Sequence, residues 1–429
     1  METLKKVLQT KSLLNKILFS LAIIILYRLL AQISIPIDNL AALKDIFNNN
    51  PLLNIFSTLT GGSAENFSIV LMGLSPYINA SIIVQLLTVI IPKFEELSKE
   101  GDTGRQKLNS ITRWLTFPLA FLQSYGMIAL LNSQSPVPII NNISDPSVIL
   151  PIMLTVTAGT VLLVWLGELI TEYGIGNGVS LLILASIIAT VPSSIAQSLM
   201  VATQDASQIP KVTGIILLTI IMIVATVLVT EAYRKVKINY ASKSKKGAES
   251  ELPIKINQAG MIPIIFAVSV VTFPTIVAQL VQGSQRPILQ MYSRIVNTHF
   301  TVNSPIYLAV LFALILGFTY FYVSITFDTN KVSENLQKRG AFIPGVRPGK
   351  DTASYLENIS NRLNLFGGLF IATIAVLPMI IQSLFGQSGA SVPVLISGAG
   401  ILIIVGVVIE LRKQINAQLI TVDYSKLIK

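Results

Sequence analysis

The residue types that usually carry catalysis or bind metals are scarce in this sequence. Cysteine does not occur, which excludes disulfides, thiolate metal ligands and cysteine nucleophiles. The single histidine, His299, excludes a metal site built on two histidines. Two glycine-rich stretches, Gly174–Gly178 and Gly398–Gly400, neither follow a strand nor contain the GxxxxGKS/T phosphate-binding pattern, which favours turns and close helix packing. We therefore expect no enzyme, no cofactor and no bound metal.

Composition restricts the class of protein further. Hydrophobic residues fill 52% of the 429 positions and charged residues 12%, about half of the roughly 25% that is typical of soluble domains. A membrane-spanning helix needs about 20 mostly apolar residues, and the sequence contains ten such stretches. They lie near residues 16–35, 67–91, 114–132, 150–170, 179–199, 212–232, 258–281, 305–327, 364–385 and 393–411. We predict an all-α polytopic membrane protein with ten transmembrane helices.

Basic residues are distributed unevenly between the two sides of the predicted membrane. Of the 31 Lys and Arg residues, 26 fall on the side of the termini, 4 fall on the opposite side, and Arg28 lies inside the first span. Because Lys and Arg concentrate in cytoplasmic segments, we place the N-terminus (1–15), the C-terminal tail (412–429) and the long loops 233–257 and 328–363 in the cytoplasm. The sequence names no partner for the charge of Arg28.

The long loop 233–257 divides the spans into two sets of five. Two halves with an odd number of spans have opposite topologies, as in an inverted repeat. We take the N-terminal half as 16–200 and the C-terminal half as 212–411, although no convincing residue-level match relates them.

The second and seventh spans are not typical of helices that only face lipid. Pro76 and Asn79 interrupt the second span, and Asn257 and Pro263 interrupt the seventh. Proline breaks the backbone hydrogen-bond ladder, and amides need partners that hydrocarbon does not provide. A water-filled cavity beside these spans is one interpretation, and tight helix packing through small residues and interhelical hydrogen bonds is the other.

Two connecting segments also have unusual compositions. Residues 51–66 are too short to span a membrane and are broken by glycine; by composition alone an ordered surface loop is favoured over a small re-entrant element. Residues 340–350 contain two prolines and three glycines, which predicts tight turns and a projecting hairpin with Arg347 at its tip. Basic loops beneath a membrane usually set topology or contact anionic lipids, and ribosomal RNA or an acidic partner surface is the more specific alternative.

Several long motifs occur in a characteristic order. They are Tyr27–Pro36, Ser75–Thr88, Lys99–Arg105, Trp165–Gly178 and Arg339–Gly349. In these stretches, and over nearly its whole length from about Lys16 to Gln414, the chain resembles the SecY family, the central channel subunits of the bacterial and plastid Sec protein translocon.

The resemblance implies a clamshell of two five-helix halves around an hourglass pore that unfolded polypeptide crosses. A plug near residues 54–66 would close the pore at rest. By the resemblance its residues are Phe56, Ser57, Thr58, Leu59, Thr60, Gly61, Gly62 and Ser63. The pore ring, aligned by eye, consists of Ile78, Ile82, Ile187, Val270 and Ile403; the family usually has isoleucine where this chain has Val270.

The resemblance also implies a lateral gate between spans two and three on one side and spans seven and eight on the other. Its polar residues fall near Thr88, Gln123 and Asn257. Partner docking falls on the two long loops. Its basic residues are Arg347, Lys243, Lys245 and Lys246.

The partners implied are the SecA ATPase or a translating ribosome, which supply the driving force, and the small subunits SecE and SecG. The implied location is a bacterial plasma membrane, with a plastid thylakoid as the alternative.

Two other classes of protein remain as alternatives. A secondary transporter with inverted repeats can also have ten helices and broken spans. Such transporters usually carry ionisable residues near the middle of the membrane, and here only Arg28 approaches that depth. An intramembrane enzyme lacks its nucleophile and metal ligands. The passive protein-conducting channel is therefore the preferred reading.

Overall fold

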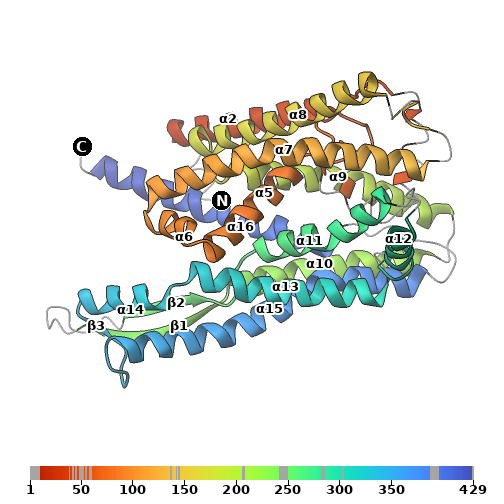
Figure 1. Cartoon of the computed structure of the whole chain (residues 1–429). Coiled ribbons are helices and arrows are strands. Elements are labelled where there is room, and N and C mark those ends of the chain that lie inside the picture. The colour runs from red at the N-terminus through yellow and green to blue at the C-terminus, as the bar shows by residue number, and fades with distance from the viewer. Residues whose placement is uncertain are drawn as a thin grey trace. The chain divides into compact units, whose positions relative to one another are not determined.

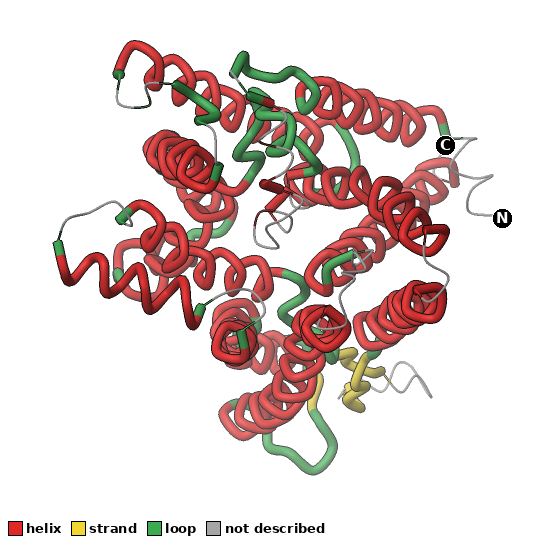
Figure 2. The backbone as a smooth tube through the Cα atoms, turned by 90° about the vertical axis from the view of Figure 1, so that its right-hand side faces the viewer, coloured by secondary structure: helices red, strands yellow, loops and turns green. Residues whose placement is uncertain are grey.

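The structure is a computed structural model of the whole chain (Figure 1). It describes residues 10–427 except 38, 41–42, 44–45, 48–52, 54–55, 58–59, 136–137, 142, 144, 205–207, 241–249, 282–285, 301–303 and 387–395. Helices form most of the described chain, and three short strands form one small sheet (Figure 2).

Each of the ten predicted spans coincides with a helix. These helices are α2 (Lys11–Leu30), α5 (Ser75–Ile90), α7 (Asp102–Gln134), α8 (Pro146–Tyr173), α9 (Gly178–Gln204), α10 (Ile209–Glu231), α11 (Ile262–Leu280), α13 (Pro305–Thr326), α15 (Lys350–Gly386) and α16 (Gly398–Leu427). Three shorter helices connect them: α6 (Pro92–Lys99), α12 (Pro287–His299) and α14 (Thr329–Lys338). The prediction of an all-α polytopic membrane fold is confirmed.

Within the described residues, seven helices are long and apolar enough to cross a membrane, or eight if α5 and α6 form one span. The other two predicted spans are occupied by α11 and α16. The apolar stretch of α11 that meets these criteria is short, Ile262–Thr272. The charges of Glu410, Arg412 and Lys413 lie near the middle of α16, which continues as helix to Leu427.

The chain divides into two compact units. The first contains residues 1–201, 269–304 and 407–429, and the second contains residues 202–268 and 305–406. This partition follows packing, whereas the halves 16–200 and 212–411 follow the order of spans, and those halves stay a prediction.

In the first unit, α5 packs against α7 and α8, and α2 packs against α8. A large hydrophobic core joins the segment after α2 to the later turns of α7 and the first turns of α8. Its most buried members include Leu43, Phe47, Phe67, Leu71, Ile128, Leu131 and Val156. Leu53 and Ala64 also belong to this core, so described residues of the segment 51–66 are packed inside the unit, although the composition of that segment favoured a surface loop.

The second span differs from its prediction in one respect. Helix α5 begins at Ser75, so Pro76 lies in its first turn, where the missing N–H has no helical partner to lose. Pro76 therefore starts the helix and does not break it. At the other end, α5 and α6 meet at Ile91 with a bend of 102°.

In the second unit, α13 lies alongside α15 (Figure 1), and α14 packs against α15. Strands β1 (Tyr233–Tyr240), β2 (Ser250–Lys255) and β3 (Ala341–Phe342) form an antiparallel sheet in the order β2-β1-β3. Val236 and Ile254 of the sheet pack with Ile343 and Leu356. The two long loops are thus joined into one folded element.

The sequence analysis did not predict this sheet. The signal was present, because apolar Val236 and Ile238 alternate with Lys235 and Lys237, and the two apolar residues are buried. Lys235 Nζ also lies 2.8 Å from Glu251 Oε2 on the neighbouring strand. The hydrogen bond and the charge of Glu251 raise the pKa of Lys235 above its ordinary value.

Candidate functional site

The described residues of the predicted plug are helical up to Thr60 and then form a glycine turn. Phe56, Ser57 and Thr60 are helical, and the turn begins at Gly61; Thr58 and Leu59 lie outside the described residues. Thr60 Oγ1 donates a hydrogen bond to the carbonyl of Phe56 at 3.0 Å, and the N–H of Gly62 donates to the carbonyl of Ser57 at 2.9 Å. Ser57, Thr60 and Ser63 are buried.

The chain that follows the plug is tied to the end of α2. Ser34 and Ser68 form an antiparallel bridge. The N–H of Ile35 donates to the carbonyl of Phe67 at 2.9 Å, and Ser68 Oγ donates to the carbonyl of Leu30 at 3.0 Å. The plug segment is therefore held from its C-terminal side by backbone pairing and by one side-chain hydrogen bond, that of Ser68.

Two adjacent residues of α2 hold the end of the plug helix. Arg28 Nη1 donates to the carbonyl of Gly61 at 2.7 Å. The Tyr27 hydroxyl donates to the carbonyl of Thr60 at 3.1 Å and lies 2.6 Å from Ser186 Oγ of α9. Tyr27 and Ser186 are 2% and 3% exposed. Arg28, whose partner the sequence did not name, is thus paired with a backbone carbonyl of the plug.

Gly61 fits this position because it has no side chain. Its φ is +68°, in the left-handed region that glycine tolerates best. A Cβ at this residue would lie 2.8 Å from Arg28 Nη1 and 2.9 Å from the Cα of Ser186. Gly62 also has a positive φ of +80°, but a Cβ there would meet nothing within 4 Å. The two glycines therefore differ in crowding and not in the sign of φ.

The predicted ring residues lie on four helices in two units. Ile78 and Ile82 lie on α5, Ile187 on α9 and Val270 on α11, all in the first unit, whereas Ile403 lies on α16 in the second. Ile82, Ile187 and Ile403 are buried, Ile78 is half-buried, and Val270 is 39% exposed. Their arrangement as a ring stays a prediction.

The predicted gate residues are also distributed over both units. Thr88 on α5 and Gln123 on α7 lie in the first unit, and Asn257 lies in the second. Thr88 Oγ1 donates to the carbonyl of Gln85 at 2.7 Å. Asn257 Oδ1 accepts from the N–H of Gly260 at 2.9 Å, so this amide shapes the turn that precedes α11. Both contacts are local, and the role of these residues in a gate stays a prediction.

The predicted docking residue Arg347 lies in an exposed turn between β3 and α15. The N–H of Val346 donates to the carbonyl of Ile343 at 3.1 Å, and Thr352 Oγ1 donates to the carbonyl of Arg347 at 2.8 Å. The backbone is therefore fixed while the Arg347 side chain is exposed. Gly345 and Gly349 have positive φ angles, as expected of tight turns. Lys243, Lys245 and Lys246 lie outside the described residues.

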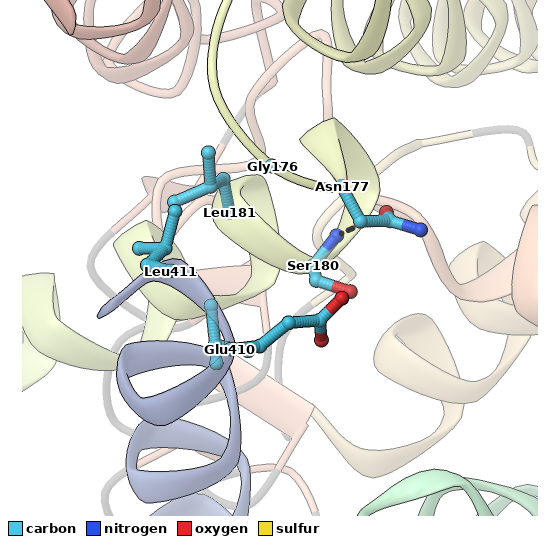
Figure 3. A pocket seen from close by; sticks show the side chains of 7 residues that line it. Gly176, Asn177, Ser180, Leu181, Glu410 and Leu411 are labelled. Atoms are coloured by element: carbon cyan, nitrogen blue, oxygen red, sulfur yellow. Dashed lines mark hydrogen bonds between the residues drawn. The ribbon is translucent and has the colours of Figure 1, made fainter. Parts of the chain in front are cut away.

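The glycine-rich stretch 174–178 forms the connection between α8 and α9. A Cβ on Gly178 would lie 1.9 Å from the carbonyl oxygen of Gly167, so this stretch permits close helix packing, as predicted. Asn177 Oδ1 accepts from the N–H of Ser180 at 3.1 Å in the first turn of α9. A small pocket lies here, and the Glu410 side chain of α16 points toward Ser180 (Figure 3).

The second glycine stretch, 398–400, starts α16. A Cβ on Gly398 would lie 2.0 Å from the carbonyl oxygen of Ile374, so this stretch also serves close packing. Among the described residues, no group of three or more His, Asp or Glu side chains could hold a metal ion.

Known proteins resemble this chain over most of its length. The sequence model of the SecY family matches residues 68–412. The chain is 37% identical to the protein translocase subunit SecY of Bacillus licheniformis, over 100% of this chain and 99% of that protein.

Solved structures share the fold. One is a SecY channel, described as having a plug domain that stabilises the closed state and maintains a membrane seal. It aligns with a TM-score of 0.67 at 19% identity, over 94% of this chain and 92% of that one. Sec61 from the canine ribosome–channel complex of the endoplasmic reticulum aligns with a TM-score of 0.65 at 19% identity, over the same shares. The match of the family model and the full-length relative show that the chain belongs to the SecY family.

Proposed function

We propose that this chain is a protein-conducting channel subunit that passes unfolded secretory polypeptides across a bacterial plasma membrane. It is a multi-pass membrane protein, and its full-length relative is a protein translocase subunit. The channel is passive, because the sequence offers no nucleotide site and the driving force must come from a partner. This function rests on membership of the family together with the plug segment.

The observation that carries the proposal is the docking of the plug. A short element between two spans, too short to cross a membrane, is held by Tyr27 and Arg28 of α2, and Tyr27 is in turn hydrogen-bonded to Ser186 of α9. Irregular backbone at membrane depth is tolerated only where protein buries it or where it lines a water-filled cavity. An element of this kind is suited to sealing a pore, and it is the part of the chain that must move when the pore opens.

The proposed constriction is the ring of Ile78, Ile82, Ile187, Val270 and Ile403. Ile78 and Ile82 lie one helical turn apart and therefore share one face of α5. Branched aliphatic side chains around a narrow pore exclude ions by dewetting, because an ion would lose hydration there and gain no new ligand. Such a ring also has no preference for the sequence of a passing chain.

Hydrophobic client segments would leave sideways between spans two and three on one side and seven and eight on the other. Thr88, Gln123 and Asn257 would supply polar side chains along this lateral gate. Cysteines introduced as Thr88→Cys and Asn257→Cys and joined by a bifunctional thiol reagent should block membrane insertion of hydrophobic clients. Unimpeded insertion through the crosslinked protein would exclude this exit.

The proposed partners dock on the joined loops 233–257 and 328–363. Arg347 is exposed on a fixed turn, which suits contact with the SecA ATPase or with ribosomal RNA of a translating ribosome. A ribosome complex is described for the related Sec61 fold. SecE and SecG would complete the channel, and anionic lipids would contact the basic loops. The strong bias of Lys and Arg supports a cytoplasmic location for both termini.

Reconstitution tests the function directly. Proteoliposomes containing this chain with SecE and SecG should import an unfolded secretory precursor when SecA and ATP are added, and the precursor should become resistant to external protease. A precursor fused to a domain held folded by a tight ligand is the matched control and should stall outside. Uptake of a small solute driven by an ion gradient, without precursor import, would instead identify a transporter.

A further inference from the structure

We propose that Tyr27, Arg28 and Ser186 form a latch that holds the plug closed and sets how readily it leaves. The inference rests on the proposed function, because it assigns the residues that regulate the same plug. Tyr27 and Arg28 of α2 donate to two consecutive carbonyl groups of the plug, those of Thr60 and Gly61, and Ser186 of α9 is hydrogen-bonded to Tyr27. These three are positioning residues for the plug and need not touch the passing polypeptide.

The chemistry of the latch suits the end of a helix. The last carbonyl groups of a helix have no partner within it, and they carry a partial negative charge that attracts cations. Thr60 is the last helical residue of the plug and Gly61 begins the turn. Tyr27 and Arg28 are adjacent in sequence, as are the two carbonyl groups they bind. Two consecutive side chains of α2 therefore donate hydrogen bonds to two consecutive carbonyl groups of the plug.

The charge of Arg28 makes this contact specific. Arg28 lies in the last turn of an apolar helix and is half-buried, and an ionised side chain in such a span is costly unless it is paired. Its Nη1 atom reaches the carbonyl of Gly61 at 2.7 Å, a short distance that is typical of a charge-assisted hydrogen bond. When the plug leaves, Arg28 loses this acceptor while it remains in its helix. Plug departure is therefore disfavoured by the cost of leaving the charge without it.

Ser186 extends the latch to α9. Its hydroxyl lies 2.6 Å from the Tyr27 hydroxyl and 2.9 Å from the carbonyl of Leu182. Each hydroxyl has one proton to donate. When Ser186 donates to Tyr27, the Tyr27 proton goes to the carbonyl of Thr60; when Ser186 donates to the carbonyl of Leu182, Tyr27 donates to Ser186 instead. Ser186 therefore acts on the docked plug through the direction of its own proton, and its burial at 3% exposed keeps water from competing.

The absence of cysteine from the sequence allows a direct test. The variant Ser63→Cys places a single thiol in the plug at a residue that is fully buried, so a maleimide can react with it only when the plug undocks. The matched thiol is Ser124→Cys, fully buried on α7 in the same unit. The labelling rates of both thiols are measured in the reconstituted complex, first alone and then combined with Arg28→Gln, Tyr27→Phe or Arg113→Gln.

Arg28→Gln should raise the labelling rate at position 63 by roughly 10- to 100-fold, as expected for loss of a hydrogen bond to a charged group. Tyr27→Phe, which keeps the buried ring and removes the hydroxyl, should raise it by roughly 2- to 10-fold. Arg113→Gln removes an exposed ion pair with Glu168 on α8 and should leave the rate unchanged. The rate at position 124 should stay constant in all three.

Unchanged labelling at position 63 in both latch variants would overturn the latch. Equal increases at positions 63 and 124 would also overturn it, because they would report general loosening of the unit. Should Arg28→Gln fail to accumulate, Tyr27→Phe decides the question alone. The proposed function is judged separately, by precursor import into the same proteoliposomes. Import by the unsubstituted complex, together with unchanged labelling in the variants, refutes only the latch. Faster labelling in the variants without any precursor import refutes only the channel function.

Discussion

Gly61→Ala should make the resting channel leak ions, because the closed plug has no room for a methyl group at this residue. The added Cβ would lie 2.8 Å from Arg28 Nη1 and 2.9 Å from the Cα of Ser186. The Arg28 side chain can move, but the backbone of α9 cannot easily do so. Relief therefore requires the plug to withdraw from α2 and α9, which weakens the seal.

The magnitude can be worked from two separate costs. An alanine at a positive φ costs about 1–2 kcal/mol, and overpacking a well-packed site costs about 1–3 kcal/mol. Gly61→Ala carries both costs and Gly62→Ala carries only the first, because nothing lies within 4 Å of a Cβ there. The two variants should therefore differ by about 1–3 kcal/mol in the stability of the docked plug, or roughly 5- to 150-fold in the ratio of closed to open channels.

The assay is the ion conductance of the purified complex in a planar bilayer without any client. Both variants should open more often than the unsubstituted channel, because both place an alanine at a positive φ. Gly61→Ala should exceed Gly62→Ala, the adjacent glycine with the same sign of φ, by the roughly 5- to 150-fold that crowding adds. Equal conductance of the two variants would refute the reasoning, since it would mean that crowding against Arg28 and Ser186 does not decide whether the plug is docked.

Three further predictions concern other parts of the chain. Replacing Ile78 and Ile82 together by serine should raise the resting ion conductance, because polar side chains rewet a constriction. Ile83→Ser, at an exposed residue on the same helix, should leave the conductance unchanged. Equal conductance of the double variant and of Ile83→Ser would mean that the ring is misassigned. Arg347→Glu should abolish SecA-driven precursor import and leave the thermal stability unchanged, since Arg347 is exposed. Lys338→Glu, an equal charge change on α14, should import normally. Normal import by Arg347→Glu would exclude this docking site. Asp145 accepts hydrogen bonds from the Ser147 hydroxyl, which has the larger effect, and from the Ser147 N–H. Both bonds lower the pKa of Asp145 below its ordinary value of 3.8. The cap that Asp145 provides for α8 should therefore stabilise the fold above pH 3.8, and this stabilisation should be lost as the pH falls through the lowered pKa. Thermal unfolding in detergent between about pH 2 and 5 should therefore depend on pH less steeply in Asp145→Asn, and identical pH profiles would contradict the assignment.

The helices could be predicted because each span must satisfy its backbone hydrogen bonds internally and needs about 20 apolar residues. All ten predicted spans coincide with helices for this reason. The small sheet was missed because it lies in the polar loops, where charge was read as a signal of topology. The alternation around Val236 and Ile238 was a sufficient signal for β1, but its partner β3 is only two residues long, Ala341–Phe342, and comes from a distant loop.

The site could be predicted only in part. The motif near Tyr27 and Arg28 was visible in the sequence, and so was the glycine turn at Gly61, but nothing along the chain connected them. The contact between Arg28 and Gly61 joins residues 33 positions apart, and that between Tyr27 and Ser186 joins residues 159 positions apart. Local periodicity carries no information about pairs at such separations.

The amino-acid sequence by itself determined that this chain resides in a membrane, where its spans lie and which family it belongs to. These properties follow from composition, from local backbone requirements and from the order of motifs. Only the tertiary structure decided which acceptor pairs with the charged side chain of Arg28. It also decided why a Cβ at Gly61 would clash while a Cβ at Gly62 would have room. Both answers depend on how α2, α9 and the plug pack together, because a hydrogen bond or a steric contact exists only when two distant segments are brought within a few ångströms.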